Sequence, residues 1–436
     1  MKKSYNELVP ALKEMLEEEA LTSLGETTRF IKRLRNVTAS AFVWATVLSR
    51  FALGRPGFEA ARHWFMRLTG QHIHPRPFQI RFKSSEAVRL FEQAFEAAVA
   101  PWTATRRLPR HPLARRFADI VAWDSTLVQV DDALKSVFKG TRAAAASLKV
   151  VLGISVWGML PLVARVVAGH QHDMVLGPSP ELFRKGSLLL LDKGFVAYEQ
   201  LRRLGEAGIH YLCPMRSNGG PLVVAVTNAP VHARKAVKDA EVGVPLRKLL
   251  PRDKKIRKAW DVEVVVRAKC QGAQSFRARL VIVPGPRGEQ RPYLTNLTQE
   301  SPRVLRELYR LRWQVELVFK ELKQDLNLTA VPTTDPHAAQ LFVWASLIAL
   351  ALSRTVAHCL NPLHQYCGLD APLRLPVVTR ALRAQMPLLG RILSLPPGRA
   401  RQLLAFLRDQ LILEARQPAR GREDSLKRLK NLAEAA

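Results

Sequence analysis

One stretch of the chain carries residues whose types and spacing could do chemistry on a charged substrate. Residues 305–326 read LRELYRLRWQVELVFKELKQDL, contain no Pro or Gly and are rich in helix formers, which predicts one long helix. At about 100° per residue, four polar side chains fall within an arc of about 60°, namely Tyr309, Arg312, Glu316 and Lys323. That arc borders an apolar stripe formed by Leu308, Leu311, Val315, Val318, Phe319, Leu322 and Leu326. The helix would hold a carboxylate, a phenol and two cations at the rim of a core.

An ordinary amphipathic helix is the alternative interpretation of this stretch. Charged flanks are common on such helices, and Arg312 with Glu316 is an i,i+4 ion pair. The spacing Tyr-x2-Arg-x3-Glu-x6-Lys is less common, since a chance match in a chain of 436 residues is on the order of one in several hundred. Lys320 lies about 40° round from Glu316 and away from the apolar stripe, so we expect it to contribute less than Arg312 or Lys323.

Two aspartates upstream each follow a run of residues with strand character. Residues 120–123 (IVAW) lead into Asp124, and residues 187–191 (SLLLL) lead into Asp192. A turn at a strand end would also explain Asp124, and a helix N-cap would also explain Asp192. Three rivals of the first aspartate lie nearby, namely Asp119, Asp131 and Asp132.

The spacing on the helix resembles the Y-R-E-K signature of DDE transposases in the insertion-sequence-four family. In that family the Glu is the third catalytic carboxylate, so the resemblance implies Asp124, Asp192 and Glu316 as the catalytic acids. The sequence LLLLDKGF resembles the family's second-Asp motif, and TTRFIKRLRNVTASAF resembles its N-terminal pattern. His172-Asp173 also resembles a short family stretch, for which we expect a structural role. The specific motifs cover residues 120–330.

Strand runs followed by a helix and another strand predict a mixed α/β sheet between residues 117 and 213. The resemblance implies an α/β fold with an RNase H-like mixed sheet core, a β-rich insertion, and flanking N- and C-terminal helical domains. Residues 292–297 (PYLTNL) are expected to return to the core as its fifth strand. The predicted divisions are an N-terminal helical DNA-binding domain (1–104), the two parts of the core (105–213 and 291–334), the insertion (214–290) and a basic helical C-terminal domain (335–436).

The chemistry that the resemblance implies is metal-dependent transfer of phosphodiester bonds. Two divalent cations about 4 Å apart can activate an attacking oxygen and stabilise the leaving oxygen. Mg²⁺ prefers hard oxygen ligands, so three carboxylates suffice, with Mn²⁺ as a possible substitute. By the same resemblance, Tyr309, Arg312 and Lys323 would hold phosphates at the transposon end. Further DNA-binding candidates are Lys193, Arg216 and Trp260, with core packing as the alternative for Trp260.

The composition indicates a globular protein with a polyanionic partner. There are 67 Lys and Arg against 37 Asp and Glu, which gives a formal charge of +30 and points to nucleic acid. Four Cys without C-x-x-C or paired Cys/His spacing fit reduced cysteines in a cytosolic protein. The start of the chain lacks the apolar segment of a signal peptide, and the apolar run at 341–353 is expected to be a buried helix too short to span a bilayer. We therefore expect a bacterial cytoplasmic, nucleoid-associated protein without a membrane partner.

The resemblance thus implies a DNA transposase that excises and inserts an insertion sequence by cutting and pasting. Its partners would be double-stranded DNA, as terminal inverted repeats and as target, and a second copy of the chain on paired ends. Two alternatives stay open. One is a DNA-binding derivative that does no chemistry, and the other is a metal-dependent nuclease on the same fold that cleaves without joining.

Overall fold

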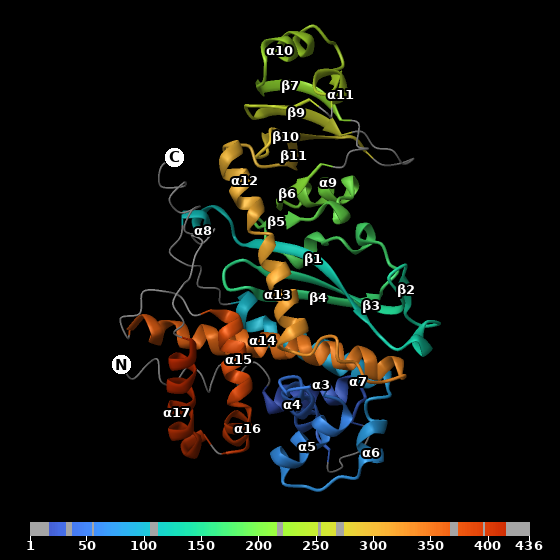
Figure 1. Cartoon of the computed structure of the whole chain (residues 1–436), viewed down its shortest axis with the longest axis vertical. Helices are drawn as coiled ribbons and strands as arrows, with labels where there is room; N and C mark the ends of the chain where they lie inside the picture. Colours follow the sequence, from blue (N-terminus) through green and yellow to red (C-terminus); the bar gives the residue numbers. More distant parts are fainter. Residues whose placement is uncertain are drawn as a thin grey trace.

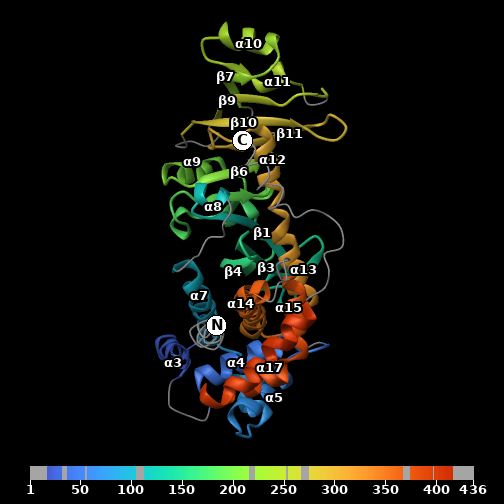
Figure 2. The ribbon, with the colours of Figure 1, turned by 90° about the vertical axis from the view of Figure 1, so that its left-hand side faces the viewer.

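A computed structural model describes residues 17–31, 37–54, 56–104, 112–215, 221–251, 254–266, 274–366, 374–395 and 397–415. The molecule is elongated, with a small α/β region at one end, the main part of a large sheet in the middle and a helical layer at the other end (Figure 1). The view turned by 90° shows the same succession (Figure 2). The fold is therefore mixed α/β, as predicted.

The central part of the sheet combines two antiparallel and two parallel strand pairings. β1 (Ile120–Gln129) pairs antiparallel with β3 (Ala144–Ser155), which pairs antiparallel with β4 (Leu160–Ala168). On its other side β1 pairs parallel with β5 (Leu188–Leu191), and β5 pairs parallel with β6 (His210–Pro214). The near-continuous apolar runs predict such strands because both of their faces are covered.

The β-rich insertion extends this sheet. β11 (Gln290–Thr295) pairs antiparallel with β6, and the order continues through β10 (Phe276–Pro284), β9 (Trp260–Val266) and β7 (Leu222–Asn228) to β8 (Val244–Pro245). The prediction that residues 292–297 form the fifth core strand was wrong, because β6 lies beside β5 and β11 is its outer, antiparallel neighbour. Two helices in the insertion, α10 (Val231–Lys238) and α11 (Leu246–Leu249), were not expected.

The predicted long helix is divided into α12 (Pro302–Arg310) and α13 (Trp313–Gln324). At the junction the amides of Leu311 and Arg312 bond to carbonyls only three residues back, at 3.0 and 3.1 Å. The division has a packing reason. Leu305, Leu308 and Leu311 lie in one apolar cluster with β5, β6 and β10, whereas Val315, Val318 and Phe319 lie in another with β1, β3 and the helical layer.

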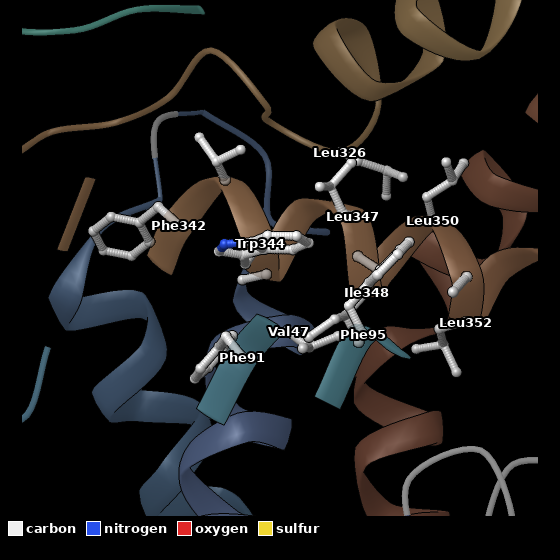
Figure 3. Packing of buried hydrophobic residues seen from close by; sticks show 14 of the residues in the cluster. Val47, Phe91, Phe95, Leu326, Phe342, Trp344, Leu347, Ile348, Leu350 and Leu352 are labelled. Carbon is white, nitrogen blue, oxygen red and sulfur yellow. The ribbon is translucent and has the colours of Figure 1, made fainter. Parts of the chain in front are cut away.

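The helical layer is built around α14 (Pro336–Tyr366), whose buried side chains contact α4 (Ala39–Ser49) and α7 (Ser85–Ala104). Figure 3 shows Trp344 and Ile348 of α14 among Val47, Phe91 and Phe95. Residues 336–360 are long and apolar enough to cross a membrane, so the expectation of a helix too short to span a bilayer was wrong. The expectation of a buried helix is confirmed, because 94% of their most apolar window is buried inside the protein. The other helices of the layer are α3 (Glu18–Thr27), α5 (Phe58–Thr69), α6 (Pro75–Ile80), α15 (Leu375–Ala384), α16 (Met386–Ser394) and α17 (Pro397–Ala415).

Candidate active site

Parallel pairing brings Asp124 and Asp192 to neighbouring positions. The last paired residues of β1 and β5 are Trp123 and Leu191, and each acid is the next residue of its strand. Side chains alternate along a strand, so Asp124 faces the same side as Ala122, which packs in the cluster that contains α13. Asp192 follows the alternation of Leu188 and Leu190, whose cluster contains α12. Both carboxylates therefore face the α12–α13 side of the sheet.

Arg312, at the junction between α12 and α13, joins the first acid to the third. Its Nη1 donates to Oδ2 of Asp124 at 2.8 Å, and its Nη2 donates to Oε1 of Glu316 at 2.6 Å. The side chains of Arg312, Asp124 and Glu316 are 15%, 19% and 33% exposed, so the three groups are only partly hydrated. Such charge-assisted bonds are stronger than neutral ones, and the planar guanidinium suits two carboxylates at once.

Burial raises the pKa of Asp124 to about 6. The amide of Ser125, which donates to Oδ1 of Asp124 at 2.8 Å, and the Arg312 guanidinium both act in the opposite direction. Asp192 and Glu316 add to the rise because their negative charges disfavour another one nearby. The three acids therefore interact electrostatically, and the site carries more negative charge than one guanidinium neutralises.

The Tyr309 ring lies beside the Arg312 guanidinium. The centroid of this ring lies 4.9 Å from that of the Tyr293 ring and 6.0 Å from the Arg312 guanidinium. Burial raises the pKa of the Tyr309 phenol, so the group stays neutral. A phenol and a guanidinium thus lie in one line along α12 and α13, beside the acids.

An open pocket of about 400 Å³ lies between β1 and α13. Asp124 and Glu316 line it, together with Lys320 and Lys323. Lys320 lies on the wall of the same pocket, one turn of α13 beyond Glu316, so its position does not support the expectation that it contributes less than Arg312 or Lys323. Both lysines are exposed, so their ammonium groups are available to an anionic ligand.

The remaining DNA-binding candidates lie in different surroundings. Lys193 is exposed directly after Asp192, on the 3₁₀ turn η4 (Lys193–Phe195). Trp260 is 4% exposed within the apolar cluster of the insertion, which favours the alternative of core packing. Arg216 lies outside the described residues.

The three rivals of Asp124 have structural partners or positions away from this pocket. Asp119 is buried before β1, where its Oδ1 accepts from Ser155 at 2.9 Å. Asp131 caps the short 3₁₀ helix that follows β1, and Asp132 is exposed at its start. Asp192 does cap a turn, as its alternative explanation requires, because its Oδ2 accepts from the amide of Gly194 at 3.3 Å.

Two further features lie beside the acids, and for one of them, Asp173, a structural role was expected from the sequence. Asp173 accepts from Ser125 and from the buried Lys149, which ties it to β1 and β3; the His172-Asp173 dipeptide was the only signal for it. Trp313, next to Arg312, is 59% exposed, so an aromatic face lies at the start of α13. Helical periodicity alone does not distinguish an exposed Trp from a core one.

The donor set fits hard divalent cations in type. Asp124 and Glu316 offer carboxylate oxygens to one guanidinium, which takes the place of a cation between them. Within the described part of the chain, no group of three or more His, Cys, Asp or Glu is close enough to hold one metal ion as it stands. Asp124, Asp192 and Glu316 would therefore hold a cation only with rearrangement of Arg312.

Comparisons with known proteins place this geometry in context. The sequence profile of the transposase DDE domain matches residues 115–352, which contain all three acids. The chain is 21% identical over 380 residues to the transposase for insertion sequence element IS231F of Bacillus thuringiensis subsp. israelensis, covering 79% of each chain. It is 19% identical over 386 residues to the transposase for insertion sequence element IS1151 of Clostridium perfringens, covering 82% of this chain and 81% of the relative.

Proposed function

We propose that this chain, which belongs to the transposase DDE domain family, cleaves and joins DNA strands at the ends of an insertion sequence. The observation that carries the proposal is that Asp124 and Glu316 both accept hydrogen bonds from the Arg312 guanidinium. Asp192 is close enough for its charge to raise the pKa of Asp124. The two relatives are transposases for insertion sequence elements, which supports the same function for this chain. Excision followed by insertion, as cut-and-paste transposition, is the form of the reaction that we propose.

The strand arrangement supports an RNase H-like core. Antiparallel neighbours β1, β3 and β4 are followed by parallel neighbours β1, β5 and β6, with one acid on β1 and the next at the end of β5. The Tyr309, Arg312, Glu316 and Lys323 spacing supports assignment to the insertion-sequence-four family through its Y-R-E-K signature. On this proposal, β7 to β10 are an insertion placed before the helix that carries the third acid.

Each residue of the site then has a proposed part in the reaction. Asp124, Asp192 and Glu316 would hold two Mg²⁺ ions, for which Mn²⁺ can substitute. When bound, divalent cations supply activation of the attacking oxygen and stabilisation of the leaving oxygen. Arg312 would turn from the acids toward a phosphate, since a guanidinium binds either group with two parallel hydrogen bonds. Lys320 and Lys323, on the wall of the pocket, would hold the backbone that leads into it.

The proposed partners follow from the formal charge of the chain and from the two ends of an insertion sequence. A formal charge of +30 suits double-stranded DNA, both as terminal inverted repeats and as target. Two ends are cut in one event, so we propose a homodimer on paired ends. Such a protein acts where the chromosome is, in the bacterial cytoplasm.

Substitution of the three acids tests this function. The substrate is a duplex taken from the DNA that flanks the reading frame, and single-turnover cleavage with Mg²⁺ is measured beside binding by gel shift. Asp124→Ala, Asp192→Ala and Glu316→Ala should each abolish cleavage and leave end binding within about threefold, because affinity comes from many cations elsewhere. Asp132→Ala, an exposed acid near the end of β1, is the matched control and should cleave like the parent.

The products separate this function from its alternatives. Joining of the cleaved end to a second duplex is expected of a transposase. Cleavage without joining would instead identify a nuclease, and binding by the parent without any cleavage would identify a silent DNA-binding derivative. An acid variant that cleaves at the parent's rate would remove that residue from the site.

A further inference from the structure

We propose that Asp173 is a positioning residue of the acid site, which fixes the turn that carries Asp192 against the strand that carries Asp124. The inference rests on the proposed function, because it concerns how the acids are held for metal binding. It also explains how Asp192 is held in place beyond the last paired residues of β1 and β5. Pairing between β1 and β5 ends at Trp123 and Leu191, so no strand hydrogen bond beyond that pair fixes Asp192 relative to Asp124.

One oxygen of Asp173 ties it to the two strands next to the site. Its Oδ1 accepts from the hydroxyl of Ser125 at 3.0 Å and from Nζ of Lys149 at 2.8 Å. Ser125 directly follows Asp124 on β1, and Lys149 lies opposite Leu127 on β3. Lys149 is 8% exposed and also donates to the carbonyl of Gln171, so the ion pair has little freedom to move.

The other oxygen of Asp173 lies against the turn after Asp192. A Cβ placed on Gly194 would lie 3.1 Å from Oδ2 of Asp173, which is closer than ordinary van der Waals contact. Gly194 is also the residue whose amide donates to Oδ2 of Asp192. The Asp173 carboxylate therefore lies against the residue that caps the second acid, and the absence of a side chain at 194 allows this approach.

Asp173 acts through its neighbours and not as a ligand in its own right. Ser125 alternates with Asp124 along β1, so its hydroxyl extends to the face of the sheet opposite to Arg312. Asp173 receives its hydrogen bond on that face, and the Lys149 ammonium balances its charge. Loss of a carboxylate that orients metal ligands without touching the metal typically weakens metal binding by about 10- to 100-fold.

The test measures Mn²⁺ binding to the full chain without DNA, by the electron paramagnetic resonance signal of free Mn²⁺, beside single-turnover cleavage. Asp173→Asn should weaken Mn²⁺ binding about tenfold. Ser125→Ala, which removes only the hydroxyl, and Gly194→Ala, which crowds the carboxylate, should weaken it about threefold each. The control is Asp261→Asn, which breaks a comparable ion pair with Arg279 in the insertion and should bind Mn²⁺ within twofold of the parent.

The outcomes separate the inference from the proposed function. If Asp192→Asn loses Mn²⁺ while Asp173→Asn, Ser125→Ala and Gly194→Ala all bind within twofold of the parent, Asp173 has no positioning role and the acid site stands. If the parent binds no Mn²⁺, or Asp192→Asn binds like the parent, the proposed function fails. Complete loss in Asp173→Asn without any effect in the other two would make Asp173 a ligand and overturn positioning. Should Asp173→Asn fail to fold, Ser125→Ala and Gly194→Ala decide the question.

Discussion

Arg312 holds two carboxylates that would otherwise repel each other. Asp124 and Glu316 lie on different elements, and the guanidinium contacts one oxygen of each at 2.8 and 2.6 Å. The same group lies over the Tyr309 ring, which limits its freedom further. On the proposed function, the guanidinium lies where a divalent cation would bind between Asp124 and Glu316, so it must move away when the cation binds.

The pKa of Asp124 predicts how the stability of the site depends on pH. Burial raises that pKa to about 6, whereas an unfolded Asp titrates near 3.9, so the folded chain holds the proton more tightly. The resulting stability is present below about pH 4 and is lost as the pH rises through about 6. Asp124→Asn cannot ionise and should therefore be more stable than the parent above pH 6.5, by up to about 3 kcal/mol.

Urea denaturation between pH 4 and pH 7.5, without divalent cations, measures this difference in the free energy of unfolding. The difference should shrink to near zero at pH 4. Asp132→Asn is the control, since that acid is exposed, and its free energy of unfolding at pH 7.5 should stay close to that of the parent. A less stable Asp124→Asn at pH 7.5 would mean that the bond to Arg312 outweighs burial.

Arg312 and the two lysines that line the pocket, Lys320 and Lys323, predict a change in the salt dependence of DNA binding. Arg312→Gln, Lys320→Gln and Lys323→Gln should each weaken binding to a cleaved end and reduce the slope of log K against log salt by about one unit. Arg202→Gln is the control, because Arg202 lies outside the pocket on α9 (Tyr198–Glu206), where it pairs with two exposed glutamates. If the three variants show the same slope as Arg202→Gln, their cations do not contact DNA phosphates and belong to an ordinary helix surface.

At the scale of elements, α13 is held in place by a buried ionic network. Glu321 accepts from Nη1 and Nη2 of Arg354 on α14 at 2.9 and 2.6 Å, and from the hydroxyl of Thr379 on α15 at 2.6 Å. Arg354 also donates to the carbonyl of Met159, in the turn between β3 and β4. The network thus joins the helix that carries Glu316 to the helical layer and to the sheet.

Removal of one partner from this network should be costly. Both charged side chains are 1% exposed, so Arg354→Met leaves Glu321 as an unpaired buried charge, and we expect a loss of about 3 to 5 kcal/mol in the free energy of unfolding. Arg310→Gln is the control, because its pair with Glu307 is partly exposed and should contribute less than about 1 kcal/mol. Urea denaturation measures both, and similar losses for the two variants would contradict the role of the network.

The elements also show where sequence patterns suffice. Apolar runs ending in Asp124 and Asp192, and the helical period around Glu316, depend on local alternation and were read correctly as strands and helix. The division between α12 and α13 was not predictable, because the residues of one continuous helical pattern pack in two different apolar clusters. The continuation of the sheet through the insertion likewise depends on β11, which pairs with its neighbour in sequence, β10, and with β6, which lies far from it in sequence. The place of Lys320 on the pocket wall was also not predictable, because the angle of a residue on a helix does not show where the neighbouring strand lies.

At the scale of the whole molecule, the helices from the two ends of the chain form one body. Val47, Phe91 and Phe95 pack in the same cluster as Trp344 and Ile348 (Figure 3). The sequence suggested separate N- and C-terminal domains because the two helical stretches are divided by the sheet-forming residues. The proposed DNA-binding helices therefore have a direct mechanical connection, through α14, to the helix that carries Glu316.

Arg50 provides the sharpest test of this joint core. It is fully buried at the end of α4, where it donates to Ser346 of α14 at 3.0 Å and to the carbonyl of Ala330 at 2.9 Å. Arg50→Met would leave these carbonyl and hydroxyl groups without their donor, at a cost of about 1 to 3 kcal/mol for each buried group.

Because α4, α7 and α14 share one core, the loss should appear in all three helices at once. Hydrogen exchange by mass spectrometry should show lower protection in peptides from these helices, by similar free energies, and unchanged protection in β9 and β10. Arg67→Gln, on the surface of α5, is the control and should change none of them. A loss confined to α4 would show instead that the N-terminal helices unfold as a separate domain, with α14 stable without them.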